Sequence, residues 1–308
     1  MNIEYELPKI PEGTSSAVTI GVFDGVHRGH VHLISQLSEQ AHLNRLTPIV
    51  LTFKMHPSHT LDPNFEPRYL TTLEKRVSLL KQLPVVEVVP VTFDKELSQL
   101  KAPMFVKLLQ TNLGMQSLVV GPDFALGHKR EGDVSNLKDL GGKMGFSVSV
   151  VEPLEEANRI IGSTAIREAL KRGHLETAAN LLGRNFALPG TVVQGSGRGR
   201  SLGFPTANLE SPKGLMIPGD GIYAAWAYLK GSRYMAATSI GTNPTFRDAA
   251  RTVEPFLLDF DEDLYDQQLT LEFVRRLRDN VRFDGIEELQ RQIAMDVEKT
   301  RTILETFR

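Results

Sequence analysis

The pattern of apolar residues changes near residue 184, and this change limits the possible folds more than any other feature of the chain. Before that point, short apolar runs typical of strands, such as Pro48–Phe53, alternate with helical patterns, such as the one that begins after Thr72. From Phe186 to Phe273 the period shortens to that of strands, with glycine or proline about every 8 to 12 residues. The first pattern predicts a doubly wound parallel sheet with helical crossovers, and the second predicts a small antiparallel barrel.

The length of 308 residues also favours two domains, because it exceeds what one hydrophobic core usually supports. A helical pattern that ends at Gly183 precedes the change, so we expect an α/β domain over residues 1–184 and a β-barrel domain over residues 185–308. Beyond Gly285, apolar residues at helical spacing predict one amphipathic helix, from Ile286 to about Leu304, that packs on the barrel.

Composition excludes several classes of protein. The chain has no cysteine, which excludes disulfides and cysteine-based metal or thiol chemistry and fits a reducing cytoplasm. No window approaches 18 apolar residues and the N-terminus lacks the pattern of a signal peptide, so we expect a cytoplasmic protein with no membrane partner. A net charge of −2 gives no overall field that would attract nucleic acid, so any phosphate binding must be local. The sequence leaves the oligomeric state open.

The stretch Val18–His30 has the layout of a phosphate site. A run of strand type ends in a turn whose glycines let the backbone lie against a ligand, and a helix opens near Gly29. The start of a helix aims unpaired N–H groups and a partial positive charge at an anion. His27 and His30, on the first turn, would face the same point and stabilise the charge on a phosphate under attack.

The histidine pair has two other interpretations. Histidines are common at helix ends, and an isolated H-x-x-H pair is most often an ordinary surface feature. The coincidence of strand, turn and two histidines favours a site. A zinc site is disfavoured, because the chain has no cysteine and no carboxylate stands at ligand spacing beside His27 and His30.

The segment GVFDGVHRGH resembles the HxGH loop of nucleotidyltransferases, in the form found in bacterial bifunctional riboflavin kinase/FMN adenylyltransferases. The resemblance runs over nearly the whole chain. It implies that the N-terminal domain transfers an adenylyl group from ATP to FMN, giving FAD and pyrophosphate, with His27 and His30 as the catalytic residues. The loop residues that would bind the substrates are Gly21, Phe23, Asp24 and Gly25.

Further residues are expected at the same edge of the sheet, because ligands bind beyond the carboxyl ends of parallel strands. His56 follows the strand Pro48–Phe53. Asp123 follows another expected strand, which begins at Gln116 and ends at the same edge, and precedes what we expect to be a loop at residues 125–133. Both side chains are therefore candidate ligand contacts.

The segment IGSTAIREAL adds three candidates. Ser163 and Thr164 can cap a helix, and Arg167 lies one turn further on the same face, a pattern that by itself is typical of a well-capped helix. The segment resembles the ISSTxxR motif of the family. The resemblance implies that these three residues hold the β- and γ-phosphates of ATP and leave the α-phosphate exposed to attack.

The chain departs from the family pattern in three places. Gly162 stands where the first serine of ISSTxxR is usual, Ala125-Leu126 replaces an Arg-Phe pair, and Lys54-Met55 replaces the usual Glu-Pro before His-Pro. These departures favour altered flavin contacts or kinetics, and they keep open the loss of adenylyl transfer.

A second candidate phosphate site lies in residues 191–209. Three glycines at alternating positions with two arginines make a turn with local positive charge, suited to covering phosphates, although a plain hairpin loop has the same composition. In the following GFPTAN, Thr206 and Asn208 point to one side at strand spacing, and their oxygens are hard ligands that Mg²⁺ accepts beside nucleotide phosphates. The candidate binding residues are Gly195, Gly197, Arg198, Gly199, Gly203, Phe204, Pro205, Thr206 and Asn208.

GFPTAN and its glycine-rich approach resemble the hallmark of riboflavin kinases, which implies that the C-terminal domain transfers the γ-phosphate of ATP to riboflavin, giving FMN and ADP. In TVEPFLLDFDEDLY, Glu254 corresponds to the catalytic base of the family, which would accept the proton of the ribityl 5′-hydroxyl. Residues 271–283 resemble the region that closes over flavin. We place Arg278 among the binding residues there, and the sequence leaves open whether it, Arg275 or Arg276 contacts flavin.

The sequence therefore predicts a two-domain transferase whose small-molecule partners are riboflavin, FMN and ATP and whose cofactor is Mg²⁺. One alternative is a riboflavin kinase whose N-terminal domain has lost adenylyl transfer. The other is a module that senses flavin nucleotides without turnover, on RNA for example, which would require a basic face that the charge balance does not support.

Overall fold

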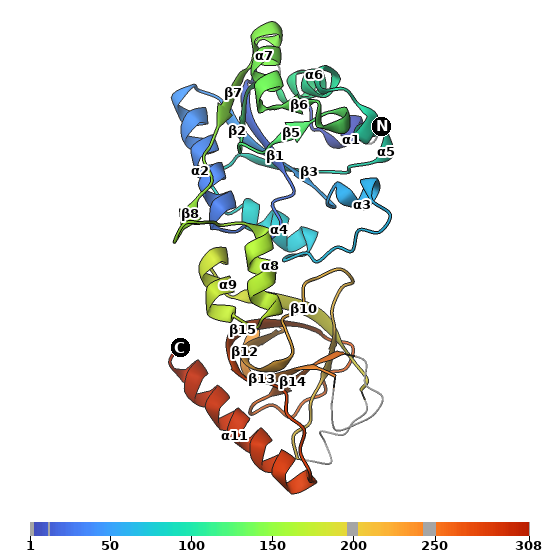
Figure 1. Cartoon of the computed structure of the whole chain (residues 1–308), viewed down its shortest axis with the longest axis vertical. Coiled ribbons are helices and arrows are strands. Elements are labelled where there is room, and N and C mark those ends of the chain that lie inside the picture. Colours follow the sequence, from blue (N-terminus) through green and yellow to red (C-terminus); the bar gives the residue numbers. More distant parts are fainter. Residues whose placement is uncertain (1–2, 12, 196–202, 243–250, 308) are drawn as a thin grey trace. The chain divides into compact units, whose positions relative to one another are not determined.

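The computed structural model describes residues 3–11, 13–195, 203–242 and 251–307, and Figure 1 shows it. The chain divides into two compact units. Unit 1 comprises residues 1–67 and 71–162, and unit 2 comprises residues 68–70 and 163–308. Each unit is organised around a sheet with its own hydrophobic core.

Unit 1 contains a five-stranded parallel sheet, which confirms the predicted doubly wound architecture. Its strand order is β3-β2-β1-β4-β7. The strands are β1 (Ser16–Gly21), β2 (Thr47–Phe53), β3 (Glu87–Val91), β4 (Met115–Val120) and β7 (Ser147–Val150).

Helices cover both faces of this sheet, because the central strands are apolar on both sides. Ile49 and Leu51 of β2 pack into one core with α6 (Ala102–Leu113) and α7 (Val134–Met144). Val50, between them, points to the other face and packs with α2 (Arg28–Leu43) and α4 (Leu73–Leu80). As predicted, Thr72 caps α4, its hydroxyl accepting a hydrogen bond from the Lys75 N–H.

Short elements complete unit 1. They are α1 (Ile3–Glu6), α3 (Ser58–Leu61), α5 (Lys95–Gln99), β5 (Ala125–Leu126), η1 (His128–Arg130), β6 (Gly132–Asp133), β8 (Glu155–Glu156) and β9 (Arg159–Ile160). The prediction of a loop at residues 125–133 was wrong, since β5 and β6 pair there. The segment is anchored because its backbone bonds to Leu100 and the Glu131 carboxylate accepts the Ala102 N–H.

Unit 2 contains the predicted antiparallel barrel, six strands in the order β11-β10-β15-β12-β13-β14. They are β10 (Phe186–Val193), β11 (Asn208–Glu210), β12 (Gly221–Leu229), β13 (Ser232–Gly241), β14 (Thr252–Leu257) and β15 (Gln268–Arg278). The Ala207 N–H donates to the Pro255 carbonyl at 2.9 Å, which joins the two edge strands and nearly closes the barrel.

In the described part of unit 2, three helices accompany the barrel. α8 (Ser163–Lys171) and α9 (Leu175–Leu182) share the core of the barrel, and α9 ends at Gly183, as predicted, with a left-handed φ of 76°. The predicted C-terminal helix is α11 (Ile286–Glu305), which packs Leu304 against the barrel. Residues 163–184 thus group with the barrel in packing. The boundary at residue 184 stays a prediction about where the catalytic domains divide.

The core of the barrel yields a test of unit 2. Phe273 is 1% exposed, and its ring lies 6.3 Å from that of Phe186 and 5.5 Å from that of Tyr223. We expect Phe273→Ala to lower the free energy of unfolding of unit 2 by about 3–5 kcal/mol, because it leaves a cavity. Trp226, the single tryptophan of the chain, lies in β12, so its fluorescence during denaturation by urea reports on this unit.

The matched control is Phe307→Ala, because that ring is 49% exposed. This variant should stay within about 0.5 kcal/mol of the parent protein. An unchanged urea midpoint for Phe273→Ala would contradict the assignment of this ring to the core.

Candidate active sites

The loop between β1 and α2 lies where the order of the parallel sheet reverses, since β2 flanks β1 on one side and β4 on the other. Open α/β sheets bind ligands at such a switch point. The loop has an unusual backbone, with left-handed φ values of 52° at Phe23, 85° at Gly25 and 40° at Val26. Such values are rare outside glycine, and they cluster at functional sites.

The structure brings the two predicted histidines together. His27 is the N-cap of α2, and its Nδ1 accepts a hydrogen bond of 3.3 Å from the His30 N–H. The two rings stack with centroids 3.6 Å apart. His27 is buried and His30 is half-buried, and Nδ1 of His30 is a buried nitrogen that has no hydrogen-bond partner in the described part of the chain.

The His30 ring is held in its neutral form. Burial lowers its pKa well below 6.5, and the neighbouring His27 and the Arg76 guanidinium lower it further. A neutral imidazole presents one N–H donor and one acceptor. At neutral pH the His30 ring can therefore donate a hydrogen bond to a phosphate oxygen without carrying a full charge.

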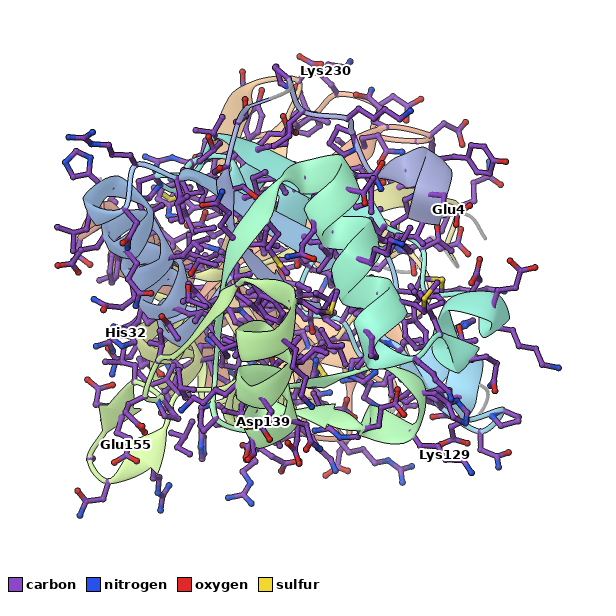
Figure 2. All side chains as sticks on the ribbon, turned by 90° about the horizontal axis from the view of Figure 1, so that it is seen from above. Glu4, His32, Lys129, Asp139, Glu155 and Lys230 are labelled. Atoms are coloured by element: carbon purple, nitrogen blue, oxygen red, sulfur yellow. The ribbon has the colours of Figure 1, made fainter. Side chains whose placement is uncertain are left out.

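The third position of the HxGH segment, Gly29, has no room for a side chain. A Cβ there would lie 2.6 Å from the Ile161 carbonyl oxygen and 3.2 Å from the His27 ring. The neighbouring Arg28 forms a salt bridge of 2.9 Å with Glu156 in the β8–β9 hairpin. Figure 2 shows this hairpin, with Glu155, on the same side of unit 1 as His32 of α2.

Other predicted residues of the loop face the protein. Asp24 is 4% exposed, and its carboxylate accepts a hydrogen bond of 3.3 Å from the Thr71 N–H. The Gly25 N–H donates to the Thr71 hydroxyl at 3.3 Å. The Phe23 ring lies over Gly21, where a Cβ would be 3.1 Å from it. These four residues therefore shape the loop, and their contact with substrate stays a prediction.

His56 and Asp123 lie just beyond the ends of β2 and β4, as expected for one edge of a parallel sheet. The His56 ring stacks on Phe65 at 5.1 Å, and its Nδ1 accepts a hydrogen bond from the Ser58 N–H. Asp123 is exposed, and its carbonyl accepts a hydrogen bond from Arg130. Neither contact prevents the two side chains from meeting a ligand at this edge.

Lys54, one of the departures from the family pattern, is neutralised within unit 1. Its Nζ lies 2.7 Å from the Glu6 carboxylate on α1. That carboxylate also accepts hydrogen bonds from the N–H and hydroxyl of Thr92. Desolvation raises the pKa of Glu6, but the bonds to Lys54 and Thr92 outweigh it and lower the pKa overall. The positive charge of Lys54 is thus paired with a carboxylate of the N-terminal helix α1.

Ser163, Thr164 and Arg167 lie in the first turns of α8, which belongs to unit 2. The Arg167 Nε donates to the Arg68 carbonyl at 2.7 Å, within the same unit. The structure therefore groups these three residues with the barrel in packing, and their role beside the histidines stays a prediction.

The structure brings GFPTAN and Glu254 together in unit 2. The ring of Phe204 packs edge-on against that of Phe256 at 5.5 Å, and the Ala207 N–H bonds to Pro255. Glu254 and Phe256 share one face of β14, because side chains two apart in a strand point the same way. The Glu254 carboxylate is half-buried and accepts a hydrogen bond of 2.8 Å from the Thr252 hydroxyl.

The glycine-rich approach is described only in part. A Cβ on Gly195 would overlap the side-chain amide of Asn208, so the glycine lets the chain just after β10 come close to the start of β11. Gly203 has a left-handed φ of 82°, and Pro205, two residues further on, is exposed. The predicted residues Gly197, Arg198 and Gly199 lie outside the described residues.

The three arginines near the end of β15 have different partners. Arg278 binds the carboxylate of Asp296, a residue of α11 that is 3% exposed, through Nε and Nη2, the latter at 2.7 Å. Arg276 donates to the Asp220 carbonyl and to Asp279, and Arg275 pairs with Glu176 at 3.3 Å. Arg278 is therefore fixed by the C-terminal helix, and its contact with flavin stays a prediction.

Sequence reasoning missed two buried charged residues, Asp296 and Arg76, the latter 1% exposed. Arg76 occupies a helix position with apolar neighbours three or four residues away, Leu73, Leu79 and Leu80, whereas around Asp296 only Ile293 at that spacing is apolar. A charge inside an apolar helical stripe is a usable signal, because it needs partners when buried.

Unit 2 also holds a pocket of about 530 Å³. Arg68, Lys171, Arg251 and Asp220 line one part of it, and residues 215–217 supply an apolar wall. The predicted site residues that the structure describes do not line this pocket. The described residues contain no group of three or more His, Asp or Glu side chains that could together hold a metal ion.

Family models and relatives agree on both halves of the chain. The FAD synthetase family matches residues 9–165, and the riboflavin kinase family matches residues 182–304. The bifunctional riboflavin kinase/FMN adenylyltransferase of Bacillus subtilis is 36% identical over 92% of this chain and 91% of its own. The protein of the same name from Escherichia coli is 36% identical over 95% and 93%. The chain belongs to this bifunctional family.

A solved structure from Streptococcus pneumoniae, named a macrolide-efflux protein, has a TM-score of 0.84 and 30% identity, covering 95% of both chains. Its name disagrees with the family assignment, which we keep because each half of this chain matches its own family. As a member of the bifunctional family, the chain is a transferase with a FAD synthetase domain and a riboflavin kinase domain.

Among the described residues, no helix combines the length and apolar character needed to cross a membrane.

The lowered pKa of His30 predicts a pH dependence of stability. Below pH 6.5 the unfolded chain binds a proton at this residue and the folded chain does not. The free energy of unfolding therefore decreases as the pH is lowered, by up to about 1.4 kcal/mol per pH unit. Urea unfolding followed by circular dichroism between pH 7 and pH 5 should show a shallower loss in His30→Gln than in the parent protein.

The control for this measurement is His42→Gln, on the exposed end of the same helix, which should keep the parent slope. Equal slopes for His30→Gln and the parent would mean that His30 titrates alike in the folded and unfolded chain.

Proposed function

We propose that this chain phosphorylates riboflavin to FMN in its C-terminal domain and then adenylates FMN to FAD in its N-terminal domain. The observation that carries the proposal is the presence of two separate clusters. The stacked pair His27 and His30 lies at the switch point of the parallel sheet, and Glu254 lies beside GFPTAN on the barrel. Each cluster supplies groups suited to one phosphate transfer.

In the N-terminal domain, an oxygen of the FMN phosphate attacks the α-phosphorus of ATP, a new P–O bond forms, and pyrophosphate leaves with the electrons of the broken bond. His27 and His30 donate hydrogen bonds to the oxygens on that phosphorus as negative charge builds up. The buried Nδ1 of His30, unsatisfied among the described residues, supports a polar ligand at this ring. No covalent intermediate is needed.

The β- and γ-phosphates of ATP are assigned to Ser163, Thr164 and Arg167. Ser163 is the first residue of α8, and the partial positive charge at the start of a helix favours an anion there. In sequence it follows Ile161 by two residues, and the Ile161 carbonyl lies against Gly29 in unit 1. Gly21, Phe23, Asp24, Gly25, His56 and Asp123 are assigned to the binding of FMN and the nucleotide base.

In the C-terminal domain, the 5′-hydroxyl oxygen of riboflavin attacks the γ-phosphorus of ATP, and ADP leaves. Glu254 accepts the hydroxyl proton during this step, which makes the attacking oxygen more nucleophilic. The hydroxyl of Thr252 holds the carboxylate through a hydrogen bond of 2.8 Å. Gly195, Gly197, Arg198, Gly199, Gly203, Phe204 and Pro205 are assigned to the nucleotide, and Arg278 to flavin.

The metal of the kinase step is assigned to Mg²⁺ on Thr206 and Asn208. A hydroxyl and an amide carbonyl are hard oxygen donors, which fit this ion together with phosphate oxygens and water. Both side chains are half-buried and lie at alternate positions around Ala207, which bonds to the strand of Glu254. When bound, the ion offsets the negative charge of the phosphates.

The adenylyl step is tested with purified protein, FMN, ATP and Mg²⁺, with flavins separated by chromatography over time. We expect the parent protein to form FAD, and His30→Ala to do so at least about 10²-fold more slowly, because the transition-state charge loses a donor. His42→Ala, an exposed change on the same helix, should match the parent.

With riboflavin instead of FMN, the parent should form FMN first and FAD later. FMN that accumulates without FAD would identify the chain as a riboflavin kinase alone, and FAD formation that is insensitive to His30→Ala would remove this residue from the mechanism.

The kinase step is tested with Glu254→Gln in the same assay. The amide cannot accept the proton, so we expect FMN formation to fall by about 10²- to 10⁴-fold while the conversion of added FMN to FAD is unchanged. The matched control is Glu262→Gln, in the exposed acidic run after β14, which should keep both activities.

A normal rate of FMN formation in Glu254→Gln would disprove the assignment of the base. A chelator of divalent cations is a further arm of this assay, and FMN formation that continues at full rate in its presence would disprove the metal role of Thr206 and Asn208.

A further inference from the structure

Residues 71–76 form hydrogen bonds to the loop between β1 and α2, from which they are separated by 46 or more positions in the sequence. We name this segment the 71–76 clasp. The Thr71 hydroxyl accepts from the Gly25 N–H, and the Thr71 N–H donates to Asp24, both at 3.3 Å. Arg76 Nη1 donates to the Val22 carbonyl at 2.8 Å. The clasp thus bonds to three of the four residues from 22 to 25.

The loop needs such support because its backbone is strained. Phe23 and Val26 hold left-handed φ values of 52° and 40°, and a β-branched residue such as valine is especially disfavoured there. Strained residues keep their conformation only when the surrounding structure fixes it. The strain ends directly at His27, so the geometry of the loop sets where that ring lies.

Arg76 is the central residue of the clasp. It is among the largest fully buried side chains of the described protein, with 1% of its surface exposed. Its two terminal nitrogens donate to two different strand ends, Nη1 to the Val22 carbonyl after β1 and Nη2 to the Lys54 carbonyl after β2, both at 2.8 Å. A rigid, planar guanidinium fixes the separation of these two carbonyls as an ammonium does not.

We propose that Arg76 is a positioning residue for adenylyl transfer, because its guanidinium holds the ends of β1 and β2 and thereby fixes the loop that carries His27 and His30. This inference rests on the adenylyltransferase activity proposed above. The side chain acts through the loop and is not assigned to contact with substrate.

The electrostatic field of Arg76 also reaches the site. Its charge is one of the causes that lower the pKa of the His30 ring, after burial and the neighbouring His27. The same positive charge, buried beneath the loop, favours the anionic phosphates that react above it. Geometry and charge therefore act in the same direction.

The test measures the conversion of FMN to FAD in Arg76→Met, Arg76→Lys and the matched control Lys75→Met. Lys75 is the exposed neighbour of Arg76 on α4, so the control loses the same charge without touching the loop. We expect kcat of Arg76→Met to fall roughly 10²-fold with little change in KM for ATP, because a shift of the reacting groups of about 1 Å costs that much. Arg76→Lys should recover part of this loss, and Lys75→Met should equal the parent.

A second readout separates positioning from a general loss of structure. In the folded protein, the pKa of the His30 ring, followed by NMR of the histidine side chains, should rise in Arg76→Met and stay unchanged in Lys75→Met. Riboflavin phosphorylation in the same preparations should stay at the parent rate. If Arg76→Met does not fold, Thr71→Val replaces it, since it removes the hydroxyl that holds Gly25 and keeps the shape of the side chain. That variant should lose roughly 10-fold in kcat.

Each outcome decides the inference. A parent protein that makes FAD while Arg76→Met or Thr71→Val makes it at the parent rate overturns the positioning role and leaves the proposed function intact. A parent protein that makes no FAD overturns the proposed function and this inference together. An unchanged His30 pKa in folded Arg76→Met shows that Arg76 does not act on that ring.

Discussion

Strands that run in parallel end at one edge of their sheet, and the N-terminal site depends on this constraint. β1, β2 and β4 deliver His27, His56 and Asp123 to that edge, although these residues lie almost 100 positions apart in the chain. The order of the sheet reverses beside β1, so the loop after this strand faces the crevice where α/β sheets bind ligands. The histidine pair is placed by topology before any single contact contributes.

In the barrel, the residues of the proposed kinase site are brought together because side chains alternate between the two faces of each strand. Side chains two apart in a strand share a face, which sets Glu254 beside Phe256 on β14. The Ala207–Pro255 hydrogen bond then joins the GFPTAN segment to this strand, and the Phe204 ring covers Phe256. The contact that nearly closes the barrel therefore also assembles the proposed kinase residues, so the stability of the barrel and the geometry of its site are linked.

Buried charges tie these sites to the surrounding structure. Arg76 joins the ends of β1 and β2 beneath the histidine loop, and Asp296 of α11 holds Arg278 at the end of β15. In both cases a buried ionic group makes at least two hydrogen bonds, an arrangement that specifies one geometry because a lost partner leaves a costly unpaired charge. Lys54 shows the same principle at the surface, since Glu6 neutralises the residue that departs most in charge from the family pattern.

The sequence by itself determined the fold class, most strands and helices, and the two motifs, because hydrophobic period, turn residues and caps are local and are written in neighbouring positions. It also identified His27, His30 and Glu254 as candidates. Only the tertiary structure decided that Asp24 turns inward, that residues 125–133 form a small ladder, that residues 163–184 pack with the barrel, and that Arg76 supports the histidine loop. These depend on contacts between distant segments, and a side chain's partner across the chain leaves no periodic signal in the sequence around it.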